Sequence, residues 1–234
     1  MKQLKWTVGK VEITQIAEME ENEIFSSFIP EAKREAIKKI NWLRPNFADE
    51  RGELKSLVQS FLIKSSGKNI LIDTCNGNGK SRPNVPQWGN LQTDYMQKFS
   101  KIGVNPEEIG YVACTHLHFD HVGWNTKKEG EKWRPTFLNA KYLFSKQEYD
   151  YWIKKPEKEM IDDFNGIDDS ITPIVEAGLA QLIDDNYQLD KNIKFFPTPG
   201  HTPHHISVEI ESDGKKAIIT GDVMHHPCQI AKPN

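Results

Sequence analysis

The sequence is poor in cysteine, in net charge and in long apolar runs. Its three cysteines, at positions 75, 114 and 228, are odd in number and far apart, which argues against a framework of disulfides. A net charge of −3 over 234 residues gives no bulk attraction to nucleic acid or to a membrane surface. No apolar run is long enough to cross a membrane, and residues 1–6 lack the apolar stretch of a signal peptide. We therefore expect a cytoplasmic protein with no nucleic-acid or membrane partner.

Histidine is absent from the first 115 residues. All eight histidines fall into three groups, at positions 116/118/121, 201/204/205 and 225/226. Histidines with ordinary packing or surface roles would be spread along the chain. Their concentration in three groups therefore indicates a shared role. The densest group lies in residues 116–121, where three imidazoles and one carboxylate follow the apolar run 111–115.

Histidine and aspartate together are ligands for zinc and similar divalent ions. In an extended segment His116 and His118 point to the same side, because side chains alternate along a strand. If the chain then bends, Asp120 and His121 can face a second position nearby. The motif therefore predicts that one short loop contributes ligands to two metal ions.

Two further candidate ligands stand at the ends of predicted strands. His201 lies on the proline-rich turn 197–203, which follows the apolar segment 193–196, and Asp222 follows the apolar segment 217–220. Functional residues often lie on loops that a rigid sheet holds in place. We therefore expect both side chains to join the histidines of the motif.

The order of predicted elements indicates the fold class. Hairpin-like strands come first, helices dominate the middle, and strands return at the end. The predicted strands lie in residues 4–17 (a pair), 57–64, 69–73, 111–115, 142–144, 193–196, 205–210 and 216–220, and the predicted helices in residues 31–41, 91–102, 146–154 and 170–178. This order predicts an α/β (α+β) fold with two sheets flanked by helices, in a single domain that spans residues 1–234.

These motifs, taken in series, resemble the metallo-β-lactamase-fold hydrolase superfamily. The matching segments are residues 71–74, 115–121, 199–203 and 221–222, in the order the family has them. The resemblance is strongest to acyl-homoserine lactonases and methyl-parathion-hydrolase-like enzymes. It implies the αββα sandwich of that superfamily.

The resemblance also implies a ligand set. His116, His118 and His201 would hold one ion, Asp120 and His121 would hold the other, and Asp222 would bridge them. Zinc is the expected metal, with manganese, iron or cobalt as alternatives. Three neighbours are expected to contact ligands rather than the metal itself, namely Asp73, His204 and His205.

This centre predicts a hydrolase. A zinc-bound water has a pKa of about 7, so a metal-bound hydroxide is available to attack a carbonyl or phosphoryl group. Asp120 would pass a proton to the leaving group. The expected substrate is a small-molecule lactone or carboxylic ester. A phosphotriester or thioester hydrolase, or a metal-binding protein without activity, remains an alternative.

Aromatic residues offer a weak indication of the substrate. They would suit an acyl chain or an aromatic ester if they lined a pocket near the metals, but for each residue taken alone core or loop packing is the favoured interpretation. The residues are Phe25, Phe28, Trp88, Phe119 and Trp124. A homodimer is a further possibility that the sequence leaves open.

The chain departs from the family pattern in two places. Members usually supply a seventh ligand, a histidine some tens of residues after the bridging aspartate, whereas this sequence ends at Asn234. We expect that the C-terminal part of the fold is lacking, or else that His225 or His226 substitutes. We also expect the second ion to be held more weakly than the first. In the lactonases a tyrosine stabilises the oxyanion at the position of His225, which is therefore the second candidate catalytic residue.

Overall fold

The computed structural model describes residues 3–20, 28–154 and 166–232. Its strands are β1 Lys5–Val8, β2 Val11–Glu20, β3 Leu57–Ser65, β4 Lys68–Ile72, β5 Tyr111–Ala113, β6 Thr126–Glu129, β7 Lys132–Pro135, β8 Lys141–Ser145, β9 Ala180–Ile183, β10 Ile193–Pro197, β11 Ile206–Ser212 and β12 Lys215–Ile219. Its α-helices are α2 Arg34–Ile37, α3 Tyr95–Lys101, α4 Phe119–Val122, α5 Lys146–Lys154, α6 Thr172–Glu176 and α7 Cys228–Ala231. Short helical turns cover Asn41–Leu43, Pro86–Trp88, Pro106–Glu108, Gly123–Asn125, Ile167–Ile171 and Gly221–Val223.

The larger sheet has seven strands in the order β1-β2-β3-β4-β5-β8-β9. The first four strands pair antiparallel, and the pairs from β4 to β9 are parallel. The last three residues of β4, Ile70–Ile72, which pair in parallel with β5, are fully buried, as expected for a strand that is covered on both faces. Strand β5, and the loop that follows it, therefore lie in the middle of the molecule.

The smaller sheet has three antiparallel strands in the order β10-β11-β12. Along β11 the residues Ile206, Val208 and Ile210 are buried, and they alternate with Ser207 and Glu209. This period of two gives the sheet one apolar face and one polar face. The apolar face packs against the larger sheet.

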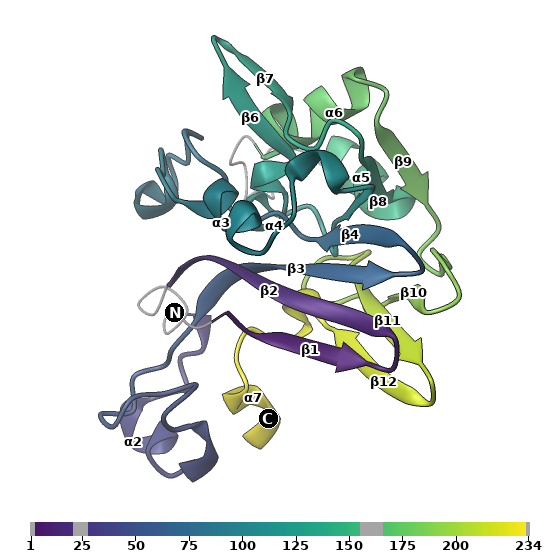
Figure 1. Ribbon diagram of the computed structural model, residues 1–234. Coiled ribbons are helices and arrows are strands. Elements are labelled where there is room, and N and C mark those ends of the chain that lie inside the picture. The colour runs from purple at the N-terminus through teal and green to yellow at the C-terminus, as the bar shows by residue number, and fades with distance from the viewer. Residues whose placement is uncertain (1–2, 21–27, 155–165, 233–234) are drawn as a thin grey trace.

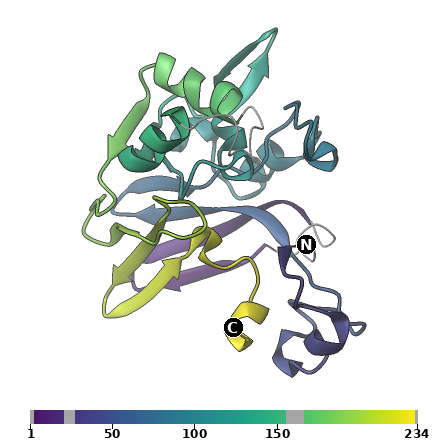
Figure 2. The ribbon, with the colours of Figure 1, turned by 180° about the vertical axis from the view of Figure 1, so that it is seen from behind.

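The elements form layers, as Figures 1 and 2 show from opposite sides. Helices α3 to α6 cover one face of the larger sheet, and strands β10 to β12 lie against its other face. Segments α2 and α7 lie together, away from the other helices. The layer order of helix, sheet and sheet matches three of the four layers of the αββα sandwich. Within the described ranges, the outward residues of the smaller sheet, such as Lys194, Glu211 and Ile218, remain exposed.

Three apolar clusters hold these layers together. The cluster between the two sheets contains Val8, Val11, Ile13, Ile63, Ile70, Ile72, Ala113, Leu143, Ile183, Ile193, Phe195, Ile206, Val208, Ile210 and Ile219. The cluster between the larger sheet and the helices contains, among others, Leu71, Tyr95, Phe99, Val112, Phe119, Trp124, Phe137, Tyr142 and Trp152. A small third cluster of Ile37, Leu43, Ala48, Leu54 and Cys228 attaches α7 to the α2 segment.

Most predicted strands are confirmed to within a few residues, and two predicted helices are too long. The helix expected over 31–41 is restricted to Arg34–Ile37, because Lys33 offers no side-chain cap and Ile40 leaves helical backbone angles. The helix expected over 91–102 begins only at Tyr95. Before it, the Thr93 N–H donates to the side chain of Asn78 at 2.8 Å.

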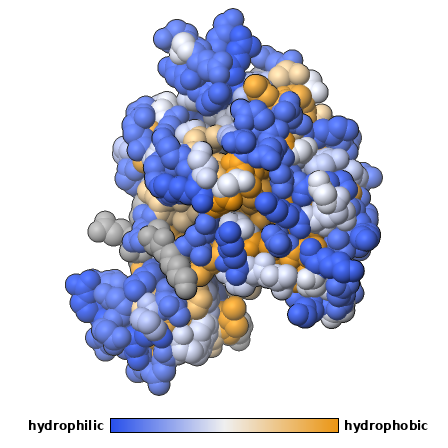
Figure 3. Space-filling view, viewed as in Figure 1, coloured by the Kyte–Doolittle hydropathy of each residue, from blue (hydrophilic) through white to orange (hydrophobic). Residues whose placement is uncertain are grey.

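Strand β9 and the hairpin of β6 and β7 were not predicted. Figure 3 shows that the surface at the position of this hairpin is almost wholly hydrophilic. Its strand residues include Lys127, Lys128, Glu129 and Lys132, which are exposed or half-buried. A strand without alternating apolar residues carries no periodic signal in the sequence.

No helix among the described residues combines the length and the apolar character needed to cross a membrane.

The clusters predict a sharp contrast between two isoleucines of the smaller sheet. Ile210 is 0% exposed between the sheets, and Ile218 is 56% exposed on the outer face. Ile210→Ala should lower the free energy of unfolding by about 2–5 kcal/mol, because it leaves a cavity. Ile218→Ala should stay within about 0.5 kcal/mol. Urea denaturation followed by circular dichroism measures both, and equal losses would contradict the assignment of the inter-sheet core.

Candidate metal centre

The motif 116–121 lies where β5 ends and α4 begins. His118 has extended backbone angles, φ −65° and ψ 150°, and helix α4 starts at the next residue. The N–H of His121 then donates to the carbonyl of His118 at 3.0 Å. This single helical turn is the bend that the sequence predicted. It carries Asp120 and His121 to the same side as the histidines before it.

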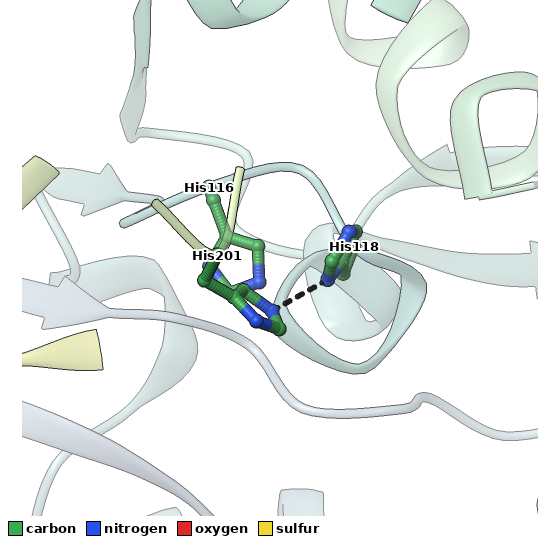
Figure 4. Close-up of side chains that lie close together, drawn as sticks. All are labelled: His116, His118 and His201. Atoms are coloured by element: carbon green, nitrogen blue, oxygen red, sulfur yellow. Dashed lines mark hydrogen bonds between the residues drawn. The ribbon is translucent and has the colours of Figure 1, made fainter. Parts of the chain in front are cut away.

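Two other loops reach this point from the smaller sheet. His201 lies on the loop between β10 and β11, and Asp222 lies on the helical turn after β12. Figure 4 shows the rings of His116, His118 and His201 gathered together. His201 Nε2 lies 2.9 Å from His118 Nδ1. Residues more than eighty positions apart thus form one cluster.

The structure brings five of the six predicted ligands, and His225, into overlapping groups. Within each group the potential ligand atoms lie within 4.8 Å of one another. The groups are His116 with His118 and His201, His116 with His121 and Asp222, and His201 with Asp222 and His225. The first group is the three-imidazole set that the sequence assigned to the first ion.

Asp222 stands between the two sides of the cluster. Its Oδ1 lies 3.3 Å from His121 Nε2. Its Oδ2 lies 3.4 Å from His201 Nε2 and 3.2 Å from His225 Nε2. One oxygen therefore faces the His121 side and the other faces the His201 side, which is the placement that a bridging carboxylate requires.

His116 provides a direct test of whether a cation fits. The residue is fully buried, and its Nε2 has no hydrogen-bond partner among the described residues. Its Nδ1 contacts the Thr115 hydroxyl at 3.1 Å. Buried polar atoms are nearly always satisfied. A divalent ion at the group of His116, His118 and His201 would satisfy this nitrogen, and imidazole nitrogens are the donors that zinc prefers.

The protonation of the imidazoles also suits metal binding. Burial lowers the pKa of His116 well below its usual value and lowers the pKa of His201 to about 4. Both rings are therefore neutral at pH 7, with a lone pair to offer. Burial also opposes a charge on His121, but Asp222, Asp73 and Asp120 outweigh it and raise the pKa of that ring.

Asp120 lies at the edge of the cluster. Its Oδ2 is 3.8 Å from His121 Nε2, and the residue belongs to none of the three groups. Burial raises the pKa of the Asp120 carboxyl, and the nearby Asp222 raises it further. Its assignment as a ligand and proton carrier stays a prediction.

Two buried side chains hydrogen-bond to candidate ligands on the side away from the cluster. Asp73 accepts a hydrogen bond from His121 Nδ1 at 2.9 Å and bonds from the N–H and hydroxyl of Thr115. This leaves His121 Nε2 facing the cluster. His205 accepts the backbone N–H of Asp222 at 3.1 Å, and its other nitrogen contacts the Thr198 hydroxyl. The expectation that Asp73 and His205 contact ligands is confirmed, as is common around metal sites.

Glu148 is the residue that the sequence did not reveal. It lies in helix α5 and is buried, and its carboxylate accepts hydrogen bonds from both ligand loops. In the sequence it is one charged residue among the polar residues of a short helix. Only the meeting of loops far apart in the chain gives it a role, so no local pattern could have identified it.

His226 faces away from the cluster. Its Nε2 bonds to the carbonyl of Phe47 and its Nδ1 accepts the N–H of Cys228. It belongs to none of the ligand groups. Of the two histidines proposed as substitutes for a missing ligand, only His225 therefore lies at the centre.

Core packing, the interpretation favoured for each aromatic residue taken alone, is confirmed for three of the five. Trp88, Phe119 and Trp124 are buried in the cluster between the larger sheet and the helices, because their rings pack against one another and their neighbours. Phe28 is exposed and its ring lies 6.1 Å from that of His225. Phe25 lies outside the described residues.

Comparison with known proteins gives consistent relatives. Residues 55–234 match the model of the "Metallo-beta-lactamase superfamily". An N-acyl homoserine lactonase from Bacillus sp is 27% identical over 178 residues, which cover 69% of this chain and 62% of the relative. A "Beta-lactamase-like protein 2 homolog" from Caenorhabditis elegans is 26% identical over 166 residues, 70% of this chain and 43% of the relative. The chain thus spans less than two thirds of the length of these curated relatives.

Solved structures share the fold. The dizinc quorum-quenching lactonase AidC superposes with a TM-score of 0.70 at 24% identity, covering 95% of this chain and 75% of that one. Because the family model covers most of the chain and contains the whole histidine motif, the resemblance read from the sequence is confirmed, and the chain belongs to the metallo-beta-lactamase superfamily.

Proposed function

We propose that this protein is a metal-dependent hydrolase that cleaves a lactone or a carboxylic ester. The observation that carries the proposal is the first ligand group, with a buried His116 Nε2 that has no other partner and a neutral His201 beside it. The N-acyl homoserine lactonase relative supports lactone chemistry. Zinc is the proposed metal, because three imidazoles with an open position form a ligand set that zinc uses in catalysis.

The roles of the side chains follow from their positions. Divalent ions at this centre would acidify water and polarise the carbonyl under attack. His116, His118 and His201 would hold the first ion, Asp120 and His121 would hold the second, and Asp222 would bridge them. The Asp120 carboxyl, with its raised pKa, is suited to hold a proton and pass it to the leaving oxygen.

His225 is proposed to contact the reacting oxygen. Its Nε2 lies 3.2 Å from Asp222 Oδ2, and this carboxylate raises the pKa of the ring. A protonated imidazole at this position would donate a hydrogen bond to negative charge that develops on the substrate. The exposed Phe28 beside it provides apolar surface for the acyl part of a substrate.

A substrate panel tests the proposed function. Lactones, aryl esters, thioesters and phosphotriesters would be offered with zinc, cobalt or manganese supplied. We expect turnover of a lactone or a carboxylic ester. Turnover of a phosphotriester or a thioester alone would assign the chemistry to that class instead. No turnover with both metal positions filled would identify a metal-binding protein without hydrolase activity.

The protonation states predict unequal binding of two ions. His116 and His201 are neutral, so the first ion displaces no proton from them. His121 is protonated at neutral pH because its pKa is raised, so a second ion must displace that proton. The second ion should therefore bind more weakly, release about one proton at His121, and bind more tightly as pH rises through the pKa of His121.

Titration calorimetry in buffers of different ionisation enthalpy measures this proton release, and dialysis against a mild chelator should leave about one ion per chain. His204→Gln is the control, because the side chain of His204 belongs to none of the ligand groups. Equal retention of two ions, without proton release, would contradict the assignment.

Replacement of Asp120 tests its proposed part in proton transfer. Asp120→Asn keeps the shape of the side chain and removes the group that titrates. It should lower kcat by about 10²–10⁴-fold, the usual contribution of general acid–base catalysis, with a much smaller change in KM. Steady-state kinetics at saturating metal measure the effect. A variant that raises KM and leaves kcat unchanged would place Asp120 in substrate binding instead.

A further inference from the structure

Glu148 is a buried carboxylate that joins the two loops of the first ligand group. It is 1% exposed on helix α5. Its Oε1 accepts the Leu117 N–H at 3.4 Å, and Leu117 stands between His116 and His118. Its Oε2 accepts the Thr202 hydroxyl at 2.9 Å and the His204 N–H at 3.2 Å, and Thr202 follows His201. The two oxygens thus divide between the loop of the larger sheet and the loop of the smaller sheet.

Trp152 extends this arrangement to a ligand ring. The indole N–H of Trp152 donates to Glu148 Oε1 at 2.7 Å. The same indole contacts the ring of His118 edge-on, with the ring centroids 5.3 Å apart. Glu148 therefore fixes the tryptophan against which His118 packs, as well as the backbone on either side of the cluster.

The four donors explain why the residue must be a carboxylate and not an amide. Each of its oxygens accepts two hydrogen bonds, and no lysine or arginine forms an ion pair with it among the described residues. A carboxylate accepts at both oxygens, whereas a glutamine accepts at one and donates at the other. Glutamine would place an N–H group against the donors of one loop.

We propose that Glu148 is the positioning residue of the first metal position, where it holds His116 and His118 in register with His201. This inference rests on the proposed metal binding and adds the group that sets its geometry. Partners behind metal ligands commonly change metal affinity by about 10- to 100-fold when they are removed. The same loss is expected for Glu148→Gln.

Glu18 supplies a matched control. It is also a buried glutamate, and it also accepts hydrogen bonds from a tryptophan N–H, a threonine hydroxyl and a backbone N–H, from Trp124, Thr93 and Asn76. It bonds to neither of the two loops that carry His116, His118 and His201. Glu18→Gln therefore removes an equivalent buried carboxylate without touching the first ligand group.

The experiment uses the full chain and cobalt(II) as the probe. Calorimetry gives the affinity of the first ion, the visible absorption of bound cobalt reports its coordination geometry, and urea denaturation of the metal-free protein gives stability. We expect Glu148→Gln to weaken the first ion by about 10- to 100-fold and to change the cobalt spectrum. Glu18→Gln should lose stability while its cobalt affinity and spectrum stay those of the unmodified chain.

Thr202→Val is the milder variant. It removes one of the two bonds to the second loop and leaves the Glu148 carboxylate in place, so it should lower the affinity for the first ion several-fold. This variant still gives a test if Glu148→Gln does not fold. Unchanged cobalt affinity and spectrum in Glu148→Gln, or in Thr202→Val where only that variant folds, would overturn the positioning role. Failure of the unmodified chain to bind cobalt would overturn the proposed function itself.

Discussion

The centre depends on the junction of the two sheets at Thr115. The carbonyl of Thr115 accepts the N–H of Ile206 at 2.9 Å, which joins the end of β5 to the start of β11. The N–H and hydroxyl of the same residue donate to Asp73. Thr115 therefore bonds to both sheets at the position immediately before His116, within the apolar contact that holds the sheets together. This junction helps to bring the loops of His201 and Asp222 to the motif.

Gly221 shows how closely the third loop must approach that junction. Gly221 has a φ of +54°, and a Cβ at this position would lie 2.5 Å from His205 Nε2 and 2.8 Å from the Thr115 hydroxyl. A side chain at this position would displace both neighbours. The absence of a Cβ lets Asp222 follow directly after the junction, with its N–H bonded to His205.

The charges gathered at this junction favour a cation. Asp73 is buried, and Asp120 and Asp222 are half-buried, close to His121, and like charges gathered without compensation are costly. The folded protein compensates in part by protonating His121 and by raising the pKa of Asp120. A divalent ion would supply the same compensation more completely. An ion that binds only the folded form at this cluster would therefore also stabilise this region.

The sequence predicted those parts of the centre that local patterns encode. The strands around Leu71 and Val112 were predicted from apolar runs. The candidate ligands of the motif His116–His121 were predicted from residue type and spacing. His201 and Asp222 followed from their places at strand ends. Glu148 could not be predicted, because its role arises from contacts across the fold. The hairpin of β6 and β7 could not be predicted either, since its charged strands bury few apolar residues.

The position of His225 bears on how the second ion is held. Its Nε2 approaches Asp222 Oδ2, the oxygen that also faces His201, whereas His121 approaches Oδ1. His225 thus stands on the side of the first ion and not beside His121. His226 is engaged with Phe47 and Cys228. Among the described histidines, His121 is therefore the one imidazole that faces Asp222 Oδ1 and lies outside the group of His116, His118 and His201. A second ion on the Oδ1 side would have this ring as its imidazole ligand. The two oxygens of Asp222 thus face different imidazoles, and Glu148 contacts the two loops on the side of His116, His118 and His201.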